Sequence, residues 1–132
     1  MKKLLFLILT VLIVSCSSDD DNTSEIEICG QSSIPGIWDS ELQIDGAPVL
    51  SLSFNSDGTG TYTYFLEGVQ YSVDFIWEST DSAIITSVTF DGETPYEWWV
   101  ADYEFFDCDR LSLQIVWSDD TIENVNLVFE RR

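Results

Sequence analysis

From residue 34 to the C-terminus, hydrophobic and polar residues alternate along the chain. Clusters of Gly, Asn, Asp and Ser interrupt this alternation about every eight to twelve residues. A period of two is typical of strands that bury one face, and the 3.6-residue period of an amphipathic helix is not found. The pattern therefore predicts an all-β segment with eight strands, at about residues 36–45, 49–54, 59–66, 69–78, 83–90, 95–105, 110–117 and 122–131.

Short turns join these strands, which favours an antiparallel up-and-down meander. A meander removes its exposed edges most completely by closing into a barrel, in which the first strand pairs with the last. The alternative is a β-sandwich, but Greek-key sandwiches need at least one longer crossover. We therefore expect an eight-stranded barrel.

The alternation also predicts which side chains share a face. In the first strand, Trp38, Leu42 and Ile44 should point the same way. Trp98 and Trp99 are adjacent and should point to opposite faces, so one of them should lie on the outside near Tyr96. Such an outer aromatic surface could bind a glycan or a protein, or simply pack against its neighbours.

The amino-acid composition limits the classes of molecule that the protein is expected to bind. The chain has 132 residues, with 24 acidic residues against five Lys and Arg and no His, for a formal charge of −19. A protein this acidic is not expected to bind nucleic acid. Because 45% of its residues are hydrophobic, it can still bury a core, and its length suits a single domain.

The N-terminus carries the features of an export signal. Two lysines precede an uncharged apolar run over residues 4–14. The run is shorter than the roughly 20 residues needed to span a bilayer but suits a signal peptide over 1–15 better than a buried helix. Residues 13–16, Ile-Val-Ser-Cys, resemble the lipobox of bacterial lipoproteins, which implies that Cys16 is acylated, for example with palmitate, and that its acyl chains attach the protein to a membrane.

Residues 17–22, Ser-Ser-Asp-Asp-Asp-Asn, are similar to the acidic signal of surface-exposed lipoproteins of Bacteroidetes-type bacteria. This resemblance implies an outer-membrane lipoprotein on the cell surface, with periplasmic retention as the alternative. Residues 16–28 would then be an acidic tether and 29–132 the folded domain. Cleavage after residue 15 removes both lysines and no acid, so the formal charge would change from −19 to −21.

With Cys16 acylated, Cys29 and Cys108 form an even pair in an oxidising compartment. We expect a disulfide that closes a loop of about 80 residues and contributes on the order of 4 kcal/mol. Two free thiols are the alternative. A metal site is less expected, because two sulfurs without His make a poor ligand set.

The domain resembles the lipocalin-like domains of Bacteroidetes lipoproteins. Gly36-Ile37-Trp38 matches the Gly-x-Trp opening of lipocalins, Phe-Asn-Ser-Asp-Gly follows at 54–58, and the chain ends in Phe-Glu-Arg-Arg. The resemblance implies that Trp38 closes the barrel floor and that Arg131 packs across it in a cation–π contact. The chain is shorter than a typical lipocalin and shows neither the helix after the barrel nor a long lid loop.

Little in the sequence points to catalysis, a metal or a cofactor. Without His, Ser-His and Cys-His nucleophile systems are excluded, and only a paired-carboxylate hydrolase remains open. Residues 55–60 are superficially like a calcium loop but lack its downstream Glu, so a hairpin with Gly58 at positive φ is preferred. Carboxylates at 102, 104, 107 and 109 could bind Ca²⁺ if they faced inward together, but they are interpreted as solvated, as are those at 119 and 120.

Two hypotheses for function follow. The first is a barrel that binds a small apolar or amphipathic ligand as a monomer, in a cavity of at least about 300 Å³ lined by Trp38, Phe54, Phe75 and Trp117. The second is a non-catalytic envelope module with a filled core that binds protein or glycan through outer aromatics. The candidate ligand-binding residues are Phe54, Tyr71, Phe75, Trp77, Trp98 and Trp117.

Overall fold

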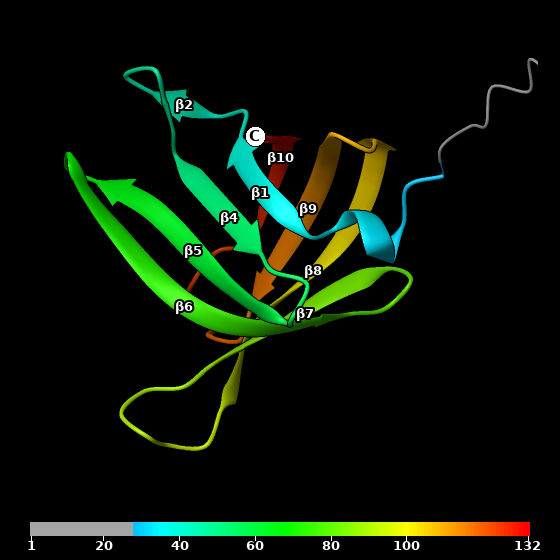
Figure 1. Ribbon diagram of the computed structural model, residues 1–132. Coiled ribbons are helices and arrows are strands. Elements are labelled where there is room, and N and C mark those ends of the chain that lie inside the picture. The colour runs from blue at the N-terminus through cyan, green and yellow to red at the C-terminus, as the bar shows by residue number, and fades with distance from the viewer. Residues whose placement is uncertain (1–27) are drawn as a thin grey trace, which may run out of the picture.

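The computed structural model describes residues 28–132 (Figure 1). The expected signal peptide, Cys16 and all of the expected tether except Ile28 lie outside the described residues. In the described part, no helix has the length and apolar character required to cross a bilayer.

The described chain is an eight-stranded antiparallel up-and-down barrel, as the sequence predicts. Its strands follow one another around the closed sheet in the order β1-β4-β5-β6-β7-β8-β9-β10, and β10 pairs with β1. A small two-stranded hairpin, β2-β3, stands outside this sheet. The bounds are η1 Gln31–Ser33, β1 Gly36–Ser40, β2 Gln43–Ile44, β3 Ala47–Pro48, β4 Leu50–Phe54, β5 Thr59–Leu66, β6 Val69–Ser79, β7 Ala83–Val88, β8 Tyr96–Asp107, β9 Arg110–Trp117 and β10 Val125–Arg131.

Six of the eight strands match the predicted ranges to within two residues at each end, and the first and last differ more. The first ends at Ser40, whose hydroxyl donates to Leu42 O and accepts from Leu50 N, so the chain leaves the sheet there. Leu42 and Ile44 are therefore 57% and 64% exposed, and the prediction that they share the buried face of Trp38 is wrong. The last strand starts at Val125, three residues late.

The two adjacent tryptophans in β8 also differ from expectation. Thr86 pairs with Trp99 but the next residue of β7, Ser87, pairs with Glu97, so Trp98 is the extra residue of a β-bulge. A bulge breaks the alternation of side chains. Trp99 is fully buried and Trp98 packs against the core instead of facing solvent. The expectation that one tryptophan points outward is wrong for this reason.

The core consists of the inward faces of the strands. Every second residue of β4 and β9 is buried, and the same alternation holds in β7. Gly60 leaves room for the core: a Cβ there would lie 2.5 Å from the Phe75 ring. The buried hydrophobic residues are Ile34, Trp38, Leu50, Leu52, Phe54, Phe75, Ile84, Val88, Trp99, Ala101, Leu111, Leu113, Ile115 and Phe129.

The segment before β1 plugs one end of the barrel. The short helix η1 leads into Ile34, which is fully buried and whose carbonyl accepts a 2.8 Å hydrogen bond from Trp38 Nε1. The Arg131 guanidinium lies 4.3 Å from the Trp38 ring, which is the cation–π contact that the lipocalin resemblance implies. Gly36 has φ +147°, and a Cβ there would lie 2.5 Å from Arg131 Nη1, so this position needs glycine.

Cys29 and Cys108 form the expected disulfide, with Cα atoms 5.2 Å apart. It joins the start of the described chain to the β8–β9 turn at the plugged end. Residues 28–132 thus contain a closed sheet, a continuous core and a disulfide, which is the make-up of a complete folding unit.

The opposite end of the barrel is not plugged. It carries the β2-β3 hairpin, the β5–β6 turn and the β7–β8 and β9–β10 connections. In Figure 1 the tips of the β5–β6 hairpin and of the β7–β8 loop lie at the left, far apart from one another. Strand β6 pairs with β7 only over Ile76–Ser79, so its first half has a hydrogen-bonded neighbour on the β5 side alone. We call this end the open end.

Candidate functional site

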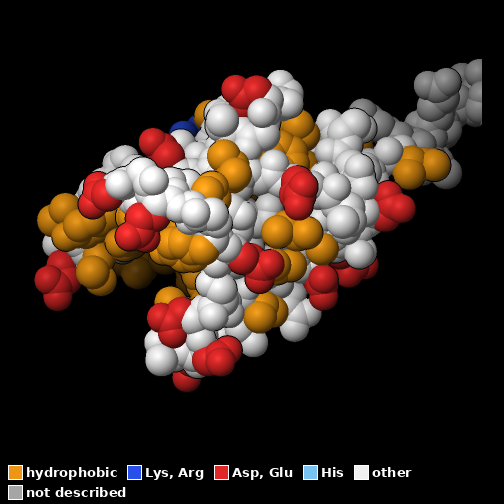
Figure 2. Space-filling model, turned by 90° about the horizontal axis from the view of Figure 1, so that it is seen from below, with side chains coloured by type: hydrophobic (Ala, Val, Ile, Leu, Met, Phe, Trp, Pro, Cys, Tyr) orange, Lys and Arg blue, Asp and Glu red, His pale blue; other side chains and the backbone are white. Residues whose placement is uncertain are grey.

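A cavity of about 440 Å³ occupies the open end of the barrel. We call it the aromatic cup. In Figure 2 hydrophobic side chains gather around a hollow at the left of the molecule, the side that carries the β5–β6 hairpin in Figure 1. The residues that line the cup are Val49, Leu50, Tyr62, Tyr64, Phe65, Trp98, Trp117, Ile122, Val125 and Leu127.

Strand alternation places most of these side chains. Tyr62 and Tyr64 are two residues apart on β5 and share its inward face, while Val125 and Leu127 do the same on β10. The bulge in β8 adds Trp98, which alternation alone would have placed outside. Apart from Tyr62, which lies at the middle of β5, the strand residues of the cup come from the half of each strand nearest the open end.

The aromatic rings of the cup touch one another. Tyr62 is the centre, with its ring 5.0 Å from Trp98, 6.0 Å from Trp117 and 5.9 Å from Tyr64. Trp98 and Trp117 are 5.7 Å apart and nearly perpendicular. Edge-to-face contacts of this kind are favourable, so the wall of the cup is a connected aromatic surface.

None of the described residues that line the cup is Asp, Glu, Lys or Arg. Burial, with a smaller effect from Tyr64, raises the pKa of the Tyr62 phenol to about 12, so this side chain is neutral throughout the physiological range. The indole Nε1 of Trp117 is buried and has no hydrogen-bond partner among the described residues. A neutral, aromatic wall is suited to apolar groups.

The residues proposed from the sequence fall into two groups. Trp98 and Trp117 line the cup, and Tyr71, although not a lining residue, stacks on the lining residue Tyr64 with ring centroids 5.3 Å apart, at 43% exposure. The other three candidates do not line it. Phe54 and Phe75 are 1% and 3% exposed in the core.

Trp77 instead closes the β4–β5 hairpin at the plugged end. Its Nε1 donates to the carbonyls of Asn55 and Thr59 at 3.1 and 3.0 Å, and its ring lies 5.2 Å from that of Phe54. The cavity is therefore not where the sequence predicts it, because Trp38, Phe54 and Phe75 fill the plugged half with their own side chains. Only Trp117 of the four expected lining residues borders it.

Sequence reasoning missed most of the cup wall. The alternation of Tyr62 and Tyr64 was visible, but nothing showed that their face was inward at the open end. The signal that could have found these residues is distance along each strand from Trp38 and Arg131. Because those two mark the closed end, inward positions at the far end of each strand are the ones left to border a cavity.

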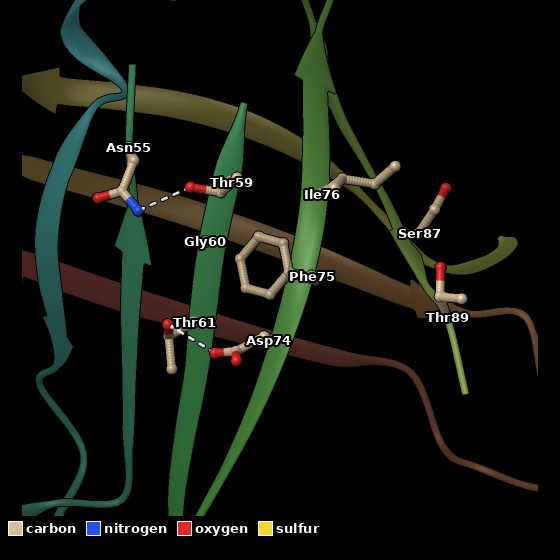
Figure 3. Close-up of a pocket in the computed structure, with 9 residues that line it drawn as sticks. All are labelled: Asn55, Thr59, Gly60, Thr61, Asp74, Phe75, Ile76, Ser87 and Thr89. Atoms are coloured by element: carbon tan, nitrogen blue, oxygen red, sulfur yellow. Dashed lines mark hydrogen bonds between the residues drawn. The ribbon is translucent and has the colours of Figure 1, made fainter. Parts of the chain in front are cut away.

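A second hollow, of about 480 Å³, lies on the outer face of β5, β6 and β7 (Figure 3). It lies where β6 and β7 separate. Its polar groups are engaged with one another, since Asn55 donates to Thr59 and Thr61 donates to Asp74 at 3.1 Å. Mostly small polar side chains border this hollow, so it lacks the apolar surface that retains a small ligand.

The sequence that is superficially like a calcium loop forms a hairpin turn with Gly58 at φ +86°. The hydroxyl and backbone N–H of Thr59 both donate to the Asp57 carboxylate and lower its pKa. This carboxylate therefore stabilises the turn. Asp119 does the same with Thr121, and its pKa is lowered for the same reason. Within residues 28–132, no three His, Cys, Asp or Glu side chains lie together as a metal site would require.

Fold and site together define a class: an up-and-down β-barrel that is plugged at one end and has an aromatic cup at the other. No family model, curated protein or solved structure matches the chain. The assignment of function therefore depends on the cup and on the N-terminal sequence.

Proposed function

We propose that this protein is a surface-anchored bacterial lipoprotein, similar to the lipocalin-like lipoproteins of Bacteroidetes, whose barrel binds a small apolar or amphipathic ligand. The observation that carries the proposal is the aromatic cup: a concave, open cavity of about 440 Å³ with a mainly apolar wall. Small-molecule sites typically have volumes of about 300–1,000 Å³ and walls of this composition.

The way the barrel is filled supports a ligand at the open end. An eight-stranded barrel is just wide enough to be filled by its own side chains or to hold one small ligand. Here the plugged half is filled around Trp38 and Phe54, and the open half is not. Exposed apolar surface costs about 25 cal/mol per Å², so a ligand that covers the cup wall gains the corresponding free energy.

A neutral fluorescent probe, N-phenyl-1-naphthylamine, tests the cup. We expect it to bind residues 28–132 with enhanced emission, and we expect Val125→Asp to weaken binding at least tenfold. Val125 lines the cup and is 36% exposed, so a carboxylate there is tolerated by the fold but repels apolar groups.

Val116→Asp is the matched control. Val116 lies on the neighbouring strand β9, is 46% exposed and does not line the cup, so this variant should bind the probe as the wild type does. Equal loss in both variants, or no probe binding at all, would overturn the proposal. Native mass spectrometry of the protein purified from its own envelope then gives the mass of the natural ligand.

The anchor is proposed from the sequence alone, because Cys16 lies outside the described residues. Metabolic labelling with a palmitate analogue should mark the wild type and not Cys16→Ser. Protease treatment of intact cells should remove the domain if it faces the medium. Label on the Cys16→Ser variant would contradict the proposed acylation, and a domain protected in intact cells would favour periplasmic retention.

The alternative, a module that binds protein or glycan through outer aromatics, has one observation in its favour. Phe90 and Tyr96 flank the β7–β8 loop with rings 5.9 Å apart, and they are 53% and 45% exposed. Trp98, which would have completed such a platform, instead lines the cup. Glycan-array binding that is lost in Phe90→Ser and kept in Val125→Asp would favour this alternative.

A further inference from the structure

The acidic residues near the cup bear on the charge of the ligand that the cup would bind. All four connections at the open end carry carboxylates, and none of them carries Lys or Arg. These residues, apart from Glu41, which pairs with Arg110, form the acidic rim: Asp45, Glu67, Asp91, Glu93, Asp119, Asp120 and Glu123. In Figure 2 red side chains flank the hollow.

The arginines of the described chain are all at the plugged end, in the β8–β9 hairpin and at the end of β10. Each is ion-paired: Arg110 with Glu41, which follows β1, Arg131 with Asp109 and Arg132 with Asp39. Within residues 28–132, no ion pair reaches the acidic rim. Among these residues, the seven rim carboxylates thus have no arginine partner, whereas the arginines of the described chain all start from the plugged end.

A third hollow adjoins the cup and is bordered by part of the rim. It has a volume of about 460 Å³ and lies between the β2-β3 hairpin and the β5–β6 turn, bordered by Asp45 and Glu67. It shares Val49 and Phe65 with the cup. Apolar wall and exposed carboxylates therefore adjoin across these two side chains.

Turn geometry accounts for only one of these two carboxylates. Asp45 and Glu67 both have positive φ, 54° and 51°, and each precedes a glycine. Asp is common in such a conformation, but Glu is not, so the turn does not explain the choice of Glu67.

We propose that the ligand of this barrel is an amphipathic cation, with an apolar part in the aromatic cup and an ammonium or other cationic head at Asp45 and Glu67. Carboxylates around a low-dielectric cavity concentrate cations at its mouth, which favours a cationic head there. The rings of Tyr62, Tyr64, Trp98 and Trp117 in the cup then contact the apolar part of the same ligand.

This inference rests on the proposed ligand-binding function, and the test separates the two. Decylammonium, decan-1-ol and decanoate share one chain length and differ in head-group charge. Their affinities for residues 28–132 are measured by displacement of N-phenyl-1-naphthylamine at low salt and below their micellar concentrations. We expect decylammonium to bind about tenfold more tightly than decanol and decanoate to bind most weakly, with the spread shrinking in about 0.5 M salt.

A double variant, Asp45→Asn with Glu67→Gln, should bind decylammonium and decanol alike and leave the affinity for decanol unchanged. Its control is Glu78→Gln with Glu104→Gln, which removes the same charge from exposed positions of β6 and β8 outside both cavities. The control should keep the preference for decylammonium.

Three results would overturn the inference. If decanol and decanoate bind as tightly as decylammonium, the cup takes amphipaths of any charge, and the proposed function survives while the inference fails. If the control loses as much preference as the double variant, net charge rather than the rim attracts the cation. If none of the three displaces the probe, the proposed function fails with it.

Discussion

Arg131 is the residue whose removal tests the plugged end most directly. Its guanidinium donates to three backbone carbonyls: Ser33 O at 2.6 Å, Pro35 O at 2.9 Å and Cys108 O at 2.9 and 3.2 Å. It also covers the Trp38 ring at 4.3 Å. One side chain thus holds together the plug, the first strand and the disulfide-bonded turn.

Arg131→Met keeps the length of the side chain and removes all of its donors. A hydrogen bond from a charged donor contributes about 1.5–3 kcal/mol, and a cation–π contact about 0.5–2 kcal/mol. Because these contributions are not additive, we expect the free energy of unfolding to fall by about 3–5 kcal/mol. For a domain of this size, that is a fall in Tm of roughly 15–30 °C.

The assay is urea unfolding followed by tryptophan fluorescence, with the disulfide intact. Arg131→Lys keeps the charge, but one ammonium cannot reach all three carbonyls, so it should lose an intermediate amount. Arg110→Met is the control, since the Arg110 side chain is exposed and, among residues 28–132, pairs with Glu41 and lies over the Phe106 ring. A loss for Arg131→Met no larger than that for Arg110→Met would refute the reasoning.

Three further predictions concern the disulfide, Tyr62 and Gly60. Cys29→Ser with Cys108→Ser should lower the free energy of unfolding by about 4 kcal/mol, measured by urea titration, and an unchanged midpoint would contradict this. Because the pKa of Tyr62 is raised to about 12, the unfolded chain releases this proton first, so the free energy of unfolding should fall by about 2 kcal/mol as the pH rises from 10 to 12. In a pH series, Tyr62→Phe should lose that part of the slope and the wild type should keep it. Gly60→Ala should destabilise the barrel by about 1–3 kcal/mol, because its Cβ meets the Phe75 ring and the Ser53 carbonyl, and a thermal midpoint equal to that of the wild type would argue against this crowding.

The period-two pattern determined the architecture of this domain. A strand that buries one face is visible in a local stretch of sequence, and short turns leave little choice of topology. Strands β5 and β9 have the predicted bounds. The disulfide between Cys29 and Cys108 was predicted because two cysteines remain once Cys16 is acylated and because the expected compartment is oxidising. The contact of Trp38 with Arg131 was predicted from the lipocalin resemblance. Local pattern and residue type were sufficient for each of these.

The tertiary structure decided where the barrel is filled and where it is open. Trp98 faces the cup because of one extra residue in β8, and whether a strand carries a bulge depends on its register with its neighbours. Leu42 and Ile44 are exposed because the chain leaves the sheet at Ser40, although their alternation continues. Alternation tells which residues share a face, but the amount of space inside depends on how side chains from eight strands meet, which no local stretch contains. The sequence therefore shows only that residues of the acidic rim are charged. The fold places two of them, Asp45 and Glu67, at the border of a cavity.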